Sequence, residues 1–134
     1  MVSRILLVDD EHEFIELIEY RLGDRSYEFI EARDGVDALN KARKFLPDLI
    51  LLDILLPDLD GLSVCEILQR QPSTKQIPVI LMSALSGNIT SRVASAHAED
   101  FFSKPLDLEK LEARIKSVLK RDASEPEDAH TLSE

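Results

Sequence analysis

The sequence predicts an α/β fold in which helices cover both faces of a parallel sheet. Short runs of large aliphatic residues, such as Leu49–Leu52, lack helical periodicity and are too short to span a membrane. Such runs are typical of strands buried on both faces of a parallel sheet. They alternate with segments whose apolar residues recur every three or four positions, as amphipathic helices require. The 134 residues, 44% of them hydrophobic, suffice for one domain with its own core.

The first half of the chain supplies three strands and two helices. The first strand ends in three consecutive acids, Asp9, Asp10 and Glu11. The helix after it also opens with an acid, which suits the positive end of a helix dipole. Pro47 ends the second helix. In chain order we expect a strand at 4–8, a helix at 13–23, a strand at 27–32, a helix around 38–45 and a strand at 49–52.

The second half repeats this alternation. Pro72 ends the third helix, and Cys65 within that helix is most simply a core residue. The fourth helix has the weakest apolar pattern in the chain, whereas the last is strongly periodic. In order we expect a helix at 61–71, a strand at 78–82, the weak helix around 89–96, a strand at 98–102 and a helix from 108.

Right-handed crossovers between parallel strands convert five such βα units into a doubly wound, flavodoxin-like sheet with strand order 2-1-3-4-5. In that order the acids that end strands one and three, Asp9, Asp10 and Asp53, meet in one crevice. Ser83 and Lys104 follow strands four and five and line the same edge. Packed carboxylates repel one another, and an oxygen-only cluster suits Mg²⁺. With a hydroxyl and an ammonium they predict a site for a transferred phosphoryl group.

Four segments, in this order along the chain, resemble the signature of response-regulator receiver domains. They are Leu7–Glu11, Leu51–Gly61, Met82–Ala84 and Ser103–Pro105. The resemblance covers about residues 3–120, so we expect a receiver domain over residues 1–121. It implies a signalling domain of a two-component system rather than an enzyme.

The resemblance also implies roles for the acids. Asp53 would be the phosphoacceptor, taking a phosphoryl group from a histidine of a sensor kinase or of a phosphotransfer protein. The product would be an acyl phosphate. Asp10 would bind Mg²⁺ directly together with Asp53, and Asp9 would assist, often through water. The backbone carbonyl of Leu55 would supply a further oxygen.

The remaining motif residues would stabilise and transmit the phosphorylated state. Lys104 would pair with one phosphoryl oxygen, and Ser83 would hydrogen-bond another. Phe101 would swing inward as that hydroxyl moves, which switches the surface formed by helix 4, strand 5 and helix 5. The Lys104-Pro105 peptide would be cis. Leu55 and Leu85 would flank the path of the water that hydrolyses the acyl phosphate.

Two features depart from the family pattern. The stretch from Ser83 to Lys104 is one residue shorter than usual, and His97 stands where the family usually has the glycine that closes helix 4. Glycine accepts a left-handed backbone at a helix end, which histidine adopts only with strain. The standard dimer surface therefore does not follow directly from the resemblance, and a homodimer on phosphorylation is one expectation among others.

Other interpretations of the acids remain open at this point. An Asp pair at a strand end is often only a helix cap. Asp58-Leu59-Asp60-Gly61 resembles the acidic motif of haloacid-dehalogenase-type phosphatases, but there the first Asp ends a strand and a Thr follows the Gly. Here a turn with a helix cap is the better interpretation, and the acids do not fit a calcium loop either. The three histidines lack metal-ligand spacing and are expected to face solvent: His12, His97 and His130.

The net charge and the C-terminal residues limit the kinds of partner expected for this chain. A net charge of −10, from 26 acids and 16 bases, argues against direct nucleic-acid binding, which needs clustered basic residues. No leader, long apolar run or disulfide framework is present, so we expect a cytoplasmic protein without membrane association. Residues 122–134 hold five acids and neither Lys nor Arg, and are expected to be a disordered tail or the start of a linker.

Three modes of action fit these observations. The chain is a single-domain regulator that works through a downstream protein, or a receiver whose effector domain is absent from this sequence. The third is an adaptor that acts without phosphorylation.

Overall fold

The structure, a computed structural model of the 134-residue chain, describes residues 2–23, 26–84 and 90–132. Of residues 90 and 121–132 it describes the backbone alone. Within these ranges five strands alternate with five helices. The strands are β1 (Ser3–Val8), β2 (Tyr27–Ala32), β3 (Leu49–Asp53), β4 (Val79–Ser83) and β5 (Asp100–Ser103). The helices are α1 (His12–Leu22), α2 (Gly35–Phe45), α3 (Gly61–Arg70), α4 (Thr90–Ser95) and α5 (Leu108–Leu132).

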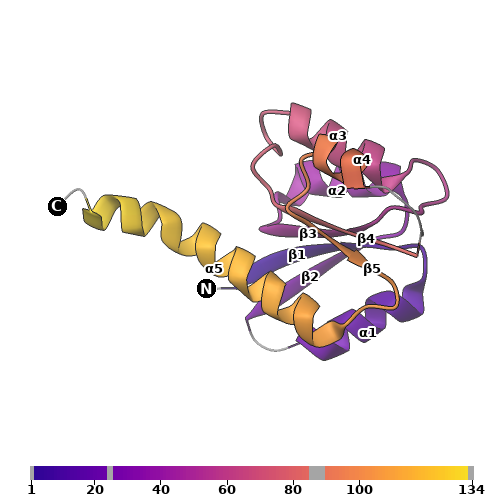
Figure 1. The fold of residues 1–134 in the computed structure, drawn as a ribbon, viewed down its shortest axis with the longest axis horizontal. Helices are drawn as coiled ribbons and strands as arrows, with labels where there is room; N and C mark the ends of the chain where they lie inside the picture. Colours follow the sequence, from indigo (N-terminus) through magenta and orange to yellow (C-terminus); the bar gives the residue numbers. More distant parts are fainter. Residues whose placement is uncertain (1, 24–25, 85–89, 133–134) are drawn as a thin grey trace.

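The strands form one parallel sheet in the order β2-β1-β3-β4-β5, which confirms the predicted topology. Figure 1 shows α1 and α5 on one face of the sheet and α2, α3 and α4 on the other. This is the doubly wound, flavodoxin-like arrangement. The ends of β1 and β3 lie side by side, with Val8 paired to Leu52, so the acids that follow these residues are neighbours.

Side chains of the central strand alternate between two apolar clusters. Ile50 and Leu52 of β3 belong to the cluster beneath α2, α3 and α4, whereas Leu49 and Leu51 pack with α1 and α5. All four are fully buried, as the sequence predicts. Because burial of one such side chain contributes roughly 1.5–3 kcal/mol, the strand that carries Asp53 is firmly held.

Phe101 and Cys65, both named in the sequence analysis, belong to the packing of this core. Phe101 packs against the cluster beneath α2, α3 and α4, and it is partly buried. Cys65 of α3 is buried, and its thiol donates a hydrogen bond to the Ala96 carbonyl at 3.3 Å. Burial raises the pKa of the Cys65 thiol to about 12, so the group stays protonated at neutral pH. The prediction that Cys65 is a core residue is confirmed.

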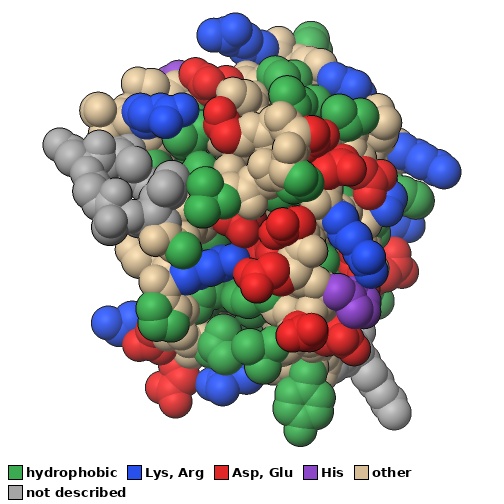
Figure 2. Space-filling model, turned by 90° about the vertical axis from the view of Figure 1, so that its right-hand side faces the viewer, with side chains coloured by type: hydrophobic (Ala, Val, Ile, Leu, Met, Phe, Trp, Pro, Cys, Tyr) green, Lys and Arg blue, Asp and Glu red, His purple; other side chains and the backbone are tan. Residues whose placement is uncertain are grey.

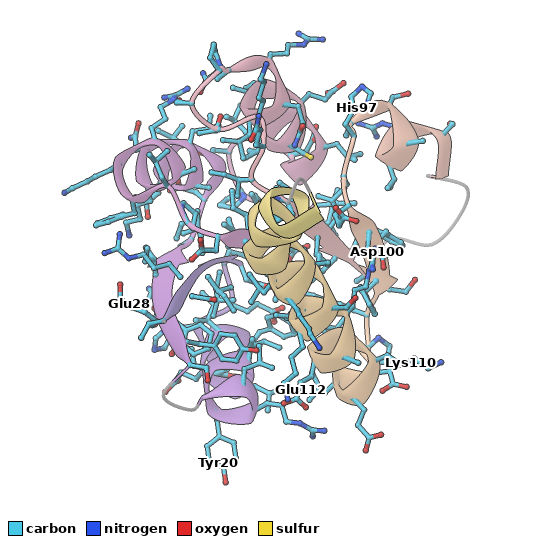
Figure 3. The ribbon with its side chains drawn as sticks, turned by 90° about the vertical axis from the view of Figure 1, so that its left-hand side faces the viewer. Tyr20, Glu28, His97, Asp100, Lys110 and Glu112 are labelled. Carbon is cyan, nitrogen blue, oxygen red and sulfur yellow. The ribbon has the colours of Figure 1, made fainter. Side chains whose placement is uncertain are left out.

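The short helix α4 ends at a strained residue. It has six residues, in keeping with its weak apolar pattern, and His97 beyond it has φ of 60°, in the left-handed region. Figure 3 shows His97 beside α4. The conformation expected of the missing glycine is therefore present, at a cost of about 1 kcal/mol. The turn at the end of α4 delays β5, which begins at Asp100 instead of the predicted Ala98.

The tail differs from the sequence-based expectation. The structure continues α5 to Leu132, through residues predicted to be disordered, and Figure 1 shows this part of the helix projecting beyond the sheet. Extending a helix that packing has already nucleated adds one hydrogen bond per residue fixed, without a new nucleation cost. Composition alone, which predicts disorder, takes no account of that attachment. The domain boundary after residue 121 stays a prediction.

Candidate functional site

Three carboxylates meet at the carboxyl end of the sheet. Oxygens of Asp9, Asp10 and Asp53 all lie within 4.8 Å of one another. Asp9 is 1% exposed and Asp53 4% exposed, whereas Asp10 is open to solvent. A group with buried oxygens on one side and an accessible carboxylate on the other can hold a hard cation.

The buried carboxylates are oriented by the turns that follow their strands. The amide of Glu11 donates to Oδ1 of Asp9 at 2.9 Å, and the amide of Leu55 donates to Oδ1 of Asp53 at 3.0 Å. In each case one oxygen is engaged by the backbone and the second points toward Lys104. The N-cap position of α1 is Glu11, whose side chain makes no capping hydrogen bond, and Asp9 instead orders the turn that leads into the helix. The capping interpretation of the Asp pair is therefore wrong, and the second oxygen of Asp9 faces Lys104.

Lys104 lies between the two buried acids. Its Nζ is 2.9 Å from Oδ2 of Asp9 and 3.1 Å from Oδ2 of Asp53. Oε1 of Glu11 is farther away, at 3.9 Å. The same nitrogen lies 4.4 Å from the centre of the Phe14 ring, within the range of a cation–π interaction. The ammonium is therefore surrounded by negative charge and by the face of an aromatic ring.

The two sides of this ion pair have displaced pKa values. Burial raises the pKa of Asp53, and the nearby charge of Asp9 acts in the same direction, while the Leu55 amide and Lys104 oppose it. For Lys104, burial acts to lower the pKa, but hydrogen bonds and attraction from Asp9 and Asp53 outweigh it and raise the pKa. Lys104 therefore remains charged, and Asp53 is a carboxylate that a second cation would help to keep ionised.

The structure describes only some of the residues for which the resemblance implies a role in switching or in hydrolysis. Ser83 is buried at the end of β4, and its carbonyl accepts the Lys104 amide at 2.8 Å, which joins the two loops. The Lys104-Pro105 peptide is cis, as the resemblance implies. Leu55, two residues beyond the end of β3, is 47% exposed. Leu85 lies outside the described residues.

Figure 2 views this edge of the sheet from the right-hand side of Figure 1. Asp and Glu side chains gather near the centre of the face, with basic side chains beside them and hydrophobic side chains below. Among the described side chains, His12 and His97 are exposed as predicted, and the side chain of His130 lies outside the description. Nε2 of His12 lies 3.5 Å from Oε1 of Glu16, one turn along α1.

Sequence reasoning missed two residues near the site. In the sequence Phe14 is only an apolar residue within the helix expected at 13–23, and the fold brings its ring against Lys104. Asp58 and Asp60 were assigned to a turn with a helix cap, and Asp60 does cap α3 by accepting the Ser63 amide at 2.8 Å. Asp58 instead reaches α2, by contacts for which the local sequence carries no signal. Because β3 ends at Asp53, Asp58 is not at a strand end, as the phosphatase motif would require.

The parallel sheet, its strand order and the acidic edge define a doubly wound α/β domain with a candidate cation site. Residues 5–116 match the response regulator receiver domain family. The chain therefore belongs to this family.

Known proteins agree with that assignment. The chain is 42% identical over 120 residues to the response regulator PleD of Caulobacter vibrioides. The aligned residues make up 88% of this chain and 26% of PleD. It is 36% identical over 130 residues to the DNA-binding dual master transcriptional regulator RpaA of Synechocystis sp., which covers 96% of this chain and 54% of RpaA. The chain thus spans between about a quarter and about half of the length of these relatives.

Solved structures show the same fold. The signal receiver domain of a histidine kinase from Syntrophus aciditrophicus has a TM-score of 0.83 and 32% identity, covering 89% of this chain and 91% of that one. A CheY-like receiver domain protein from Methanospirillum hungatei has a TM-score of 0.84 and 25% identity, and the match covers 93% of this chain and 99% of that one. In the described part of the chain, no helix has the length and apolar character needed to cross a membrane.

Proposed function

We propose that this receiver domain accepts a phosphoryl group on Asp53 from a histidine kinase or a histidine phosphotransfer protein. The observation that supports this most strongly is the setting of Asp53. It is buried at the end of the central strand, with one oxygen held by the Leu55 amide and the other 3.1 Å from Lys104. A carboxylate fixed in this way is preorganised to attack phosphorus in line.

The transfer conserves atoms and charge as follows. An oxygen of Asp53 forms a bond to phosphorus while the bond from phosphorus to the donor histidine nitrogen breaks. The electron pair stays on that nitrogen, which then takes up a proton. The product is an acyl phosphate on Asp53. Lys104 would then form an ion pair with one of its phosphoryl oxygens.

The donor set fits Mg²⁺. All ligand atoms of the acidic cluster are carboxylate oxygens, and Asp10 is accessible to an entering ion. Asp10 and Asp53 would bind it directly, Asp9 would assist, and the Leu55 carbonyl would supply a further oxygen. Held by these residues, Mg²⁺ would supply positive charge against the phosphoryl oxygens. Asp9, held by Lys104 and by the Glu11 amide, keeps the cluster in place before the ion binds.

The output would pass through the surface formed by α4, β5 and α5. Ser83 would hydrogen-bond the phosphoryl group, and Phe101 would move inward behind it. Two exits for this signal are consistent with the relatives. Regulators such as RpaA are longer than this chain and DNA-binding by name, so the signal could pass to an effector domain joined to the receiver. Alternatively, it could pass to a separate protein that contacts this surface. The acidic receiver itself is proposed not to bind nucleic acid, and the protein to act in the cytoplasm.

The phosphoacceptor is tested by mass. Incubation with acetyl phosphate and Mg²⁺ should add about 80 Da, one phosphoryl group, to the intact protein. Asp53→Asn should abolish the adduct, and Asp10→Asn or removal of Mg²⁺ should suppress it. An Asp53→Asn protein that gains the same adduct at another position contradicts the assignment. A wild-type protein that gains none with acetyl phosphate or with any histidine phosphodonor favours the adaptor that acts without phosphorylation.

A further inference from the structure

The loop between β3 and α3 is held at both ends. The Gly61 amide donates to the Ile54 carbonyl at 2.7 Å, which closes the loop on itself. A side chain at Gly61 would place its Cβ 2.3 Å from the Asp53 carbonyl oxygen, so the start of α3 presses directly on the end of β3. Near its beginning the loop carries Leu55, whose amide orients the Asp53 carboxylate.

The middle of this loop is tied to a different helix. Oδ1 of Asp58 accepts the Gly35 amide at 2.7 Å, and Oδ2 accepts the Val36 amide at 3.0 Å. These amides begin α2, where the first N–H groups have no partner within the helix. The two hydrogen bonds lower the pKa of Asp58. The carboxylate thus bridges the loop and α2 with both of its oxygens.

The same helix start has a cap of its own. Asp34 precedes α2, and its Oδ1 accepts the Asp37 amide at 2.8 Å. Capping α2 therefore does not depend on Asp58 alone. The loop also packs closely here, since a Cβ at Gly35 would lie 2.7 Å from Cβ of Leu59 and 3.0 Å from Cγ2 of Val64. Loop and helix start meet without space for another atom.

We propose that Asp58 is a positioning residue for the metal site. By holding the β3–α3 loop against α2, it fixes the backbone of Leu55, which orients Asp53 through its amide and would face the ion through its carbonyl. This inference rests on the proposed function in one respect, namely that Mg²⁺ binds at the acidic cluster. Asp58 acts at a distance and touches no reacting atom.

The first experiment uses the metal-free, unphosphorylated protein. Hydrogen exchange of the Leu55 amide, followed by NMR, should speed up about fivefold in Asp58→Ala, because the loop opens more often. Asp34→Ala is the matched control, since it removes one carboxylate from the same helix end and leaves the loop bonded. In that variant the exchange of Leu55 should not change, although amides at the start of α2 exchange faster.

The second experiment is a calorimetric titration with Mg²⁺. Asp58→Ala should weaken binding about fivefold, less than the roughly 10- to 100-fold cost of losing a group bonded directly to a ligand. Asp58→Asn is neutral but keeps a carbonyl oxygen that can accept one of the two amides. It should therefore fall between Asp58→Ala and the wild type. Asp34→Ala should bind Mg²⁺ like the wild type.

The outcomes separate this inference from the proposed function. Equal Leu55 exchange and equal Mg²⁺ affinity in Asp58→Ala and Asp34→Ala would overturn the positioning role and leave Asp58 as a second helix cap. Equal losses in Asp58→Asn and Asp58→Ala would attribute the effect to charge and also overturn it. A wild type that binds no Mg²⁺, or binds it unchanged after Asp10→Asn, refutes the metal site and this inference together. If Asp58→Ala does not fold, the comparison of Asp58→Asn with Asp34→Ala decides.

Discussion

The ammonium of Lys104 lies 3.1 Å from Oδ2 of Asp53, although the two residues are 51 positions apart and β4 lies between the strands that they end or follow. Lys104 also contacts Asp9, so one cation compensates two buried carboxylates. Removing a partner from such a group leaves charge buried without compensation. The ion pair thus links the stability of the resting domain to the position of its reactive groups.

Lys104→Met should destabilise the protein by about 3 kcal/mol, measured by urea unfolding without divalent ions, because Asp9 and Asp53 then repel each other unopposed. Adding Mg²⁺ should recover part of the loss, since the ion replaces the missing charge. Lys110→Met, at an exposed lysine of α5, is the control for the change in net charge and should cost little. A Lys104→Met protein as stable as Lys110→Met would show that the pair contributes nothing to folding.

Glu19 gives a pH dependence with a definite sign. Burial raises the pKa of Glu19 to about 7 from its ordinary 4.5, helped by a hydrogen bond to Glu31 and by the charges of Glu31 and Glu16. Between these two pKa values the folded state binds the extra proton, so stability should fall as pH rises from 4.5 to about 7. Glu19→Gln should flatten that part of the profile of melting temperature against pH. Glu109→Gln on α5 should leave it unchanged, and so would Glu19→Gln if Glu19 titrates normally.

The strands and the reactive edge could be predicted because local patterns determine them. The apolar residues Leu49–Leu52 are consecutive and show no helical spacing, so they predict a buried strand. Asp53 follows them directly, which places it at the carboxyl end of that strand. The Asp58 contact with Gly35 could not be predicted in this way, because it joins residues 23 apart that meet only once α2 and α3 pack side by side. Phe14 is similar, since its apolar character fits any core position. His97 is an intermediate case: the sequence places it at a helix end where glycine is usual, but its backbone geometry does not follow from the sequence, and the structure shows a left-handed conformation.

Deleting residues 122–134 should shift the melting temperature by no more than about a degree or two, because exposed terminal residues contribute little to stability. The structure adds a second readout to this prediction. α5 continues to Leu132 and projects from the sheet, so the truncated protein should also lose helical signal in far-UV circular dichroism. Loss of helical signal without loss of stability fits a projecting helix. A fall of several degrees would mean that the segment docks on the domain.

The lifetime of the phosphorylated state should depend on Leu55 and Leu85. Leu55 follows Asp53, the proposed phosphoacceptor, by two positions, and its side chain is 47% exposed. In the family the equivalent position after the hydroxyl residue, here Leu85, flanks the same path. Neither side chain can orient or deprotonate water, and both would shield the phosphoryl group, so hydrolysis should be slow.

Acidic or amide side chains at these two positions can hold a water in line with the phosphorus atom. The double change Leu55→Asn with Leu85→Glu should therefore accelerate dephosphorylation about tenfold or more, which corresponds to about 1.4 kcal/mol of barrier. Decay of the phosphorylated protein in Mg²⁺, followed by intact mass, measures the rate. Val36→Asn, at an exposed apolar residue of α2, controls for the loss of surface hydrophobicity. Equal decay rates in the wild type and the double variant would reject shielding, and the leucines would then only cover apolar surface.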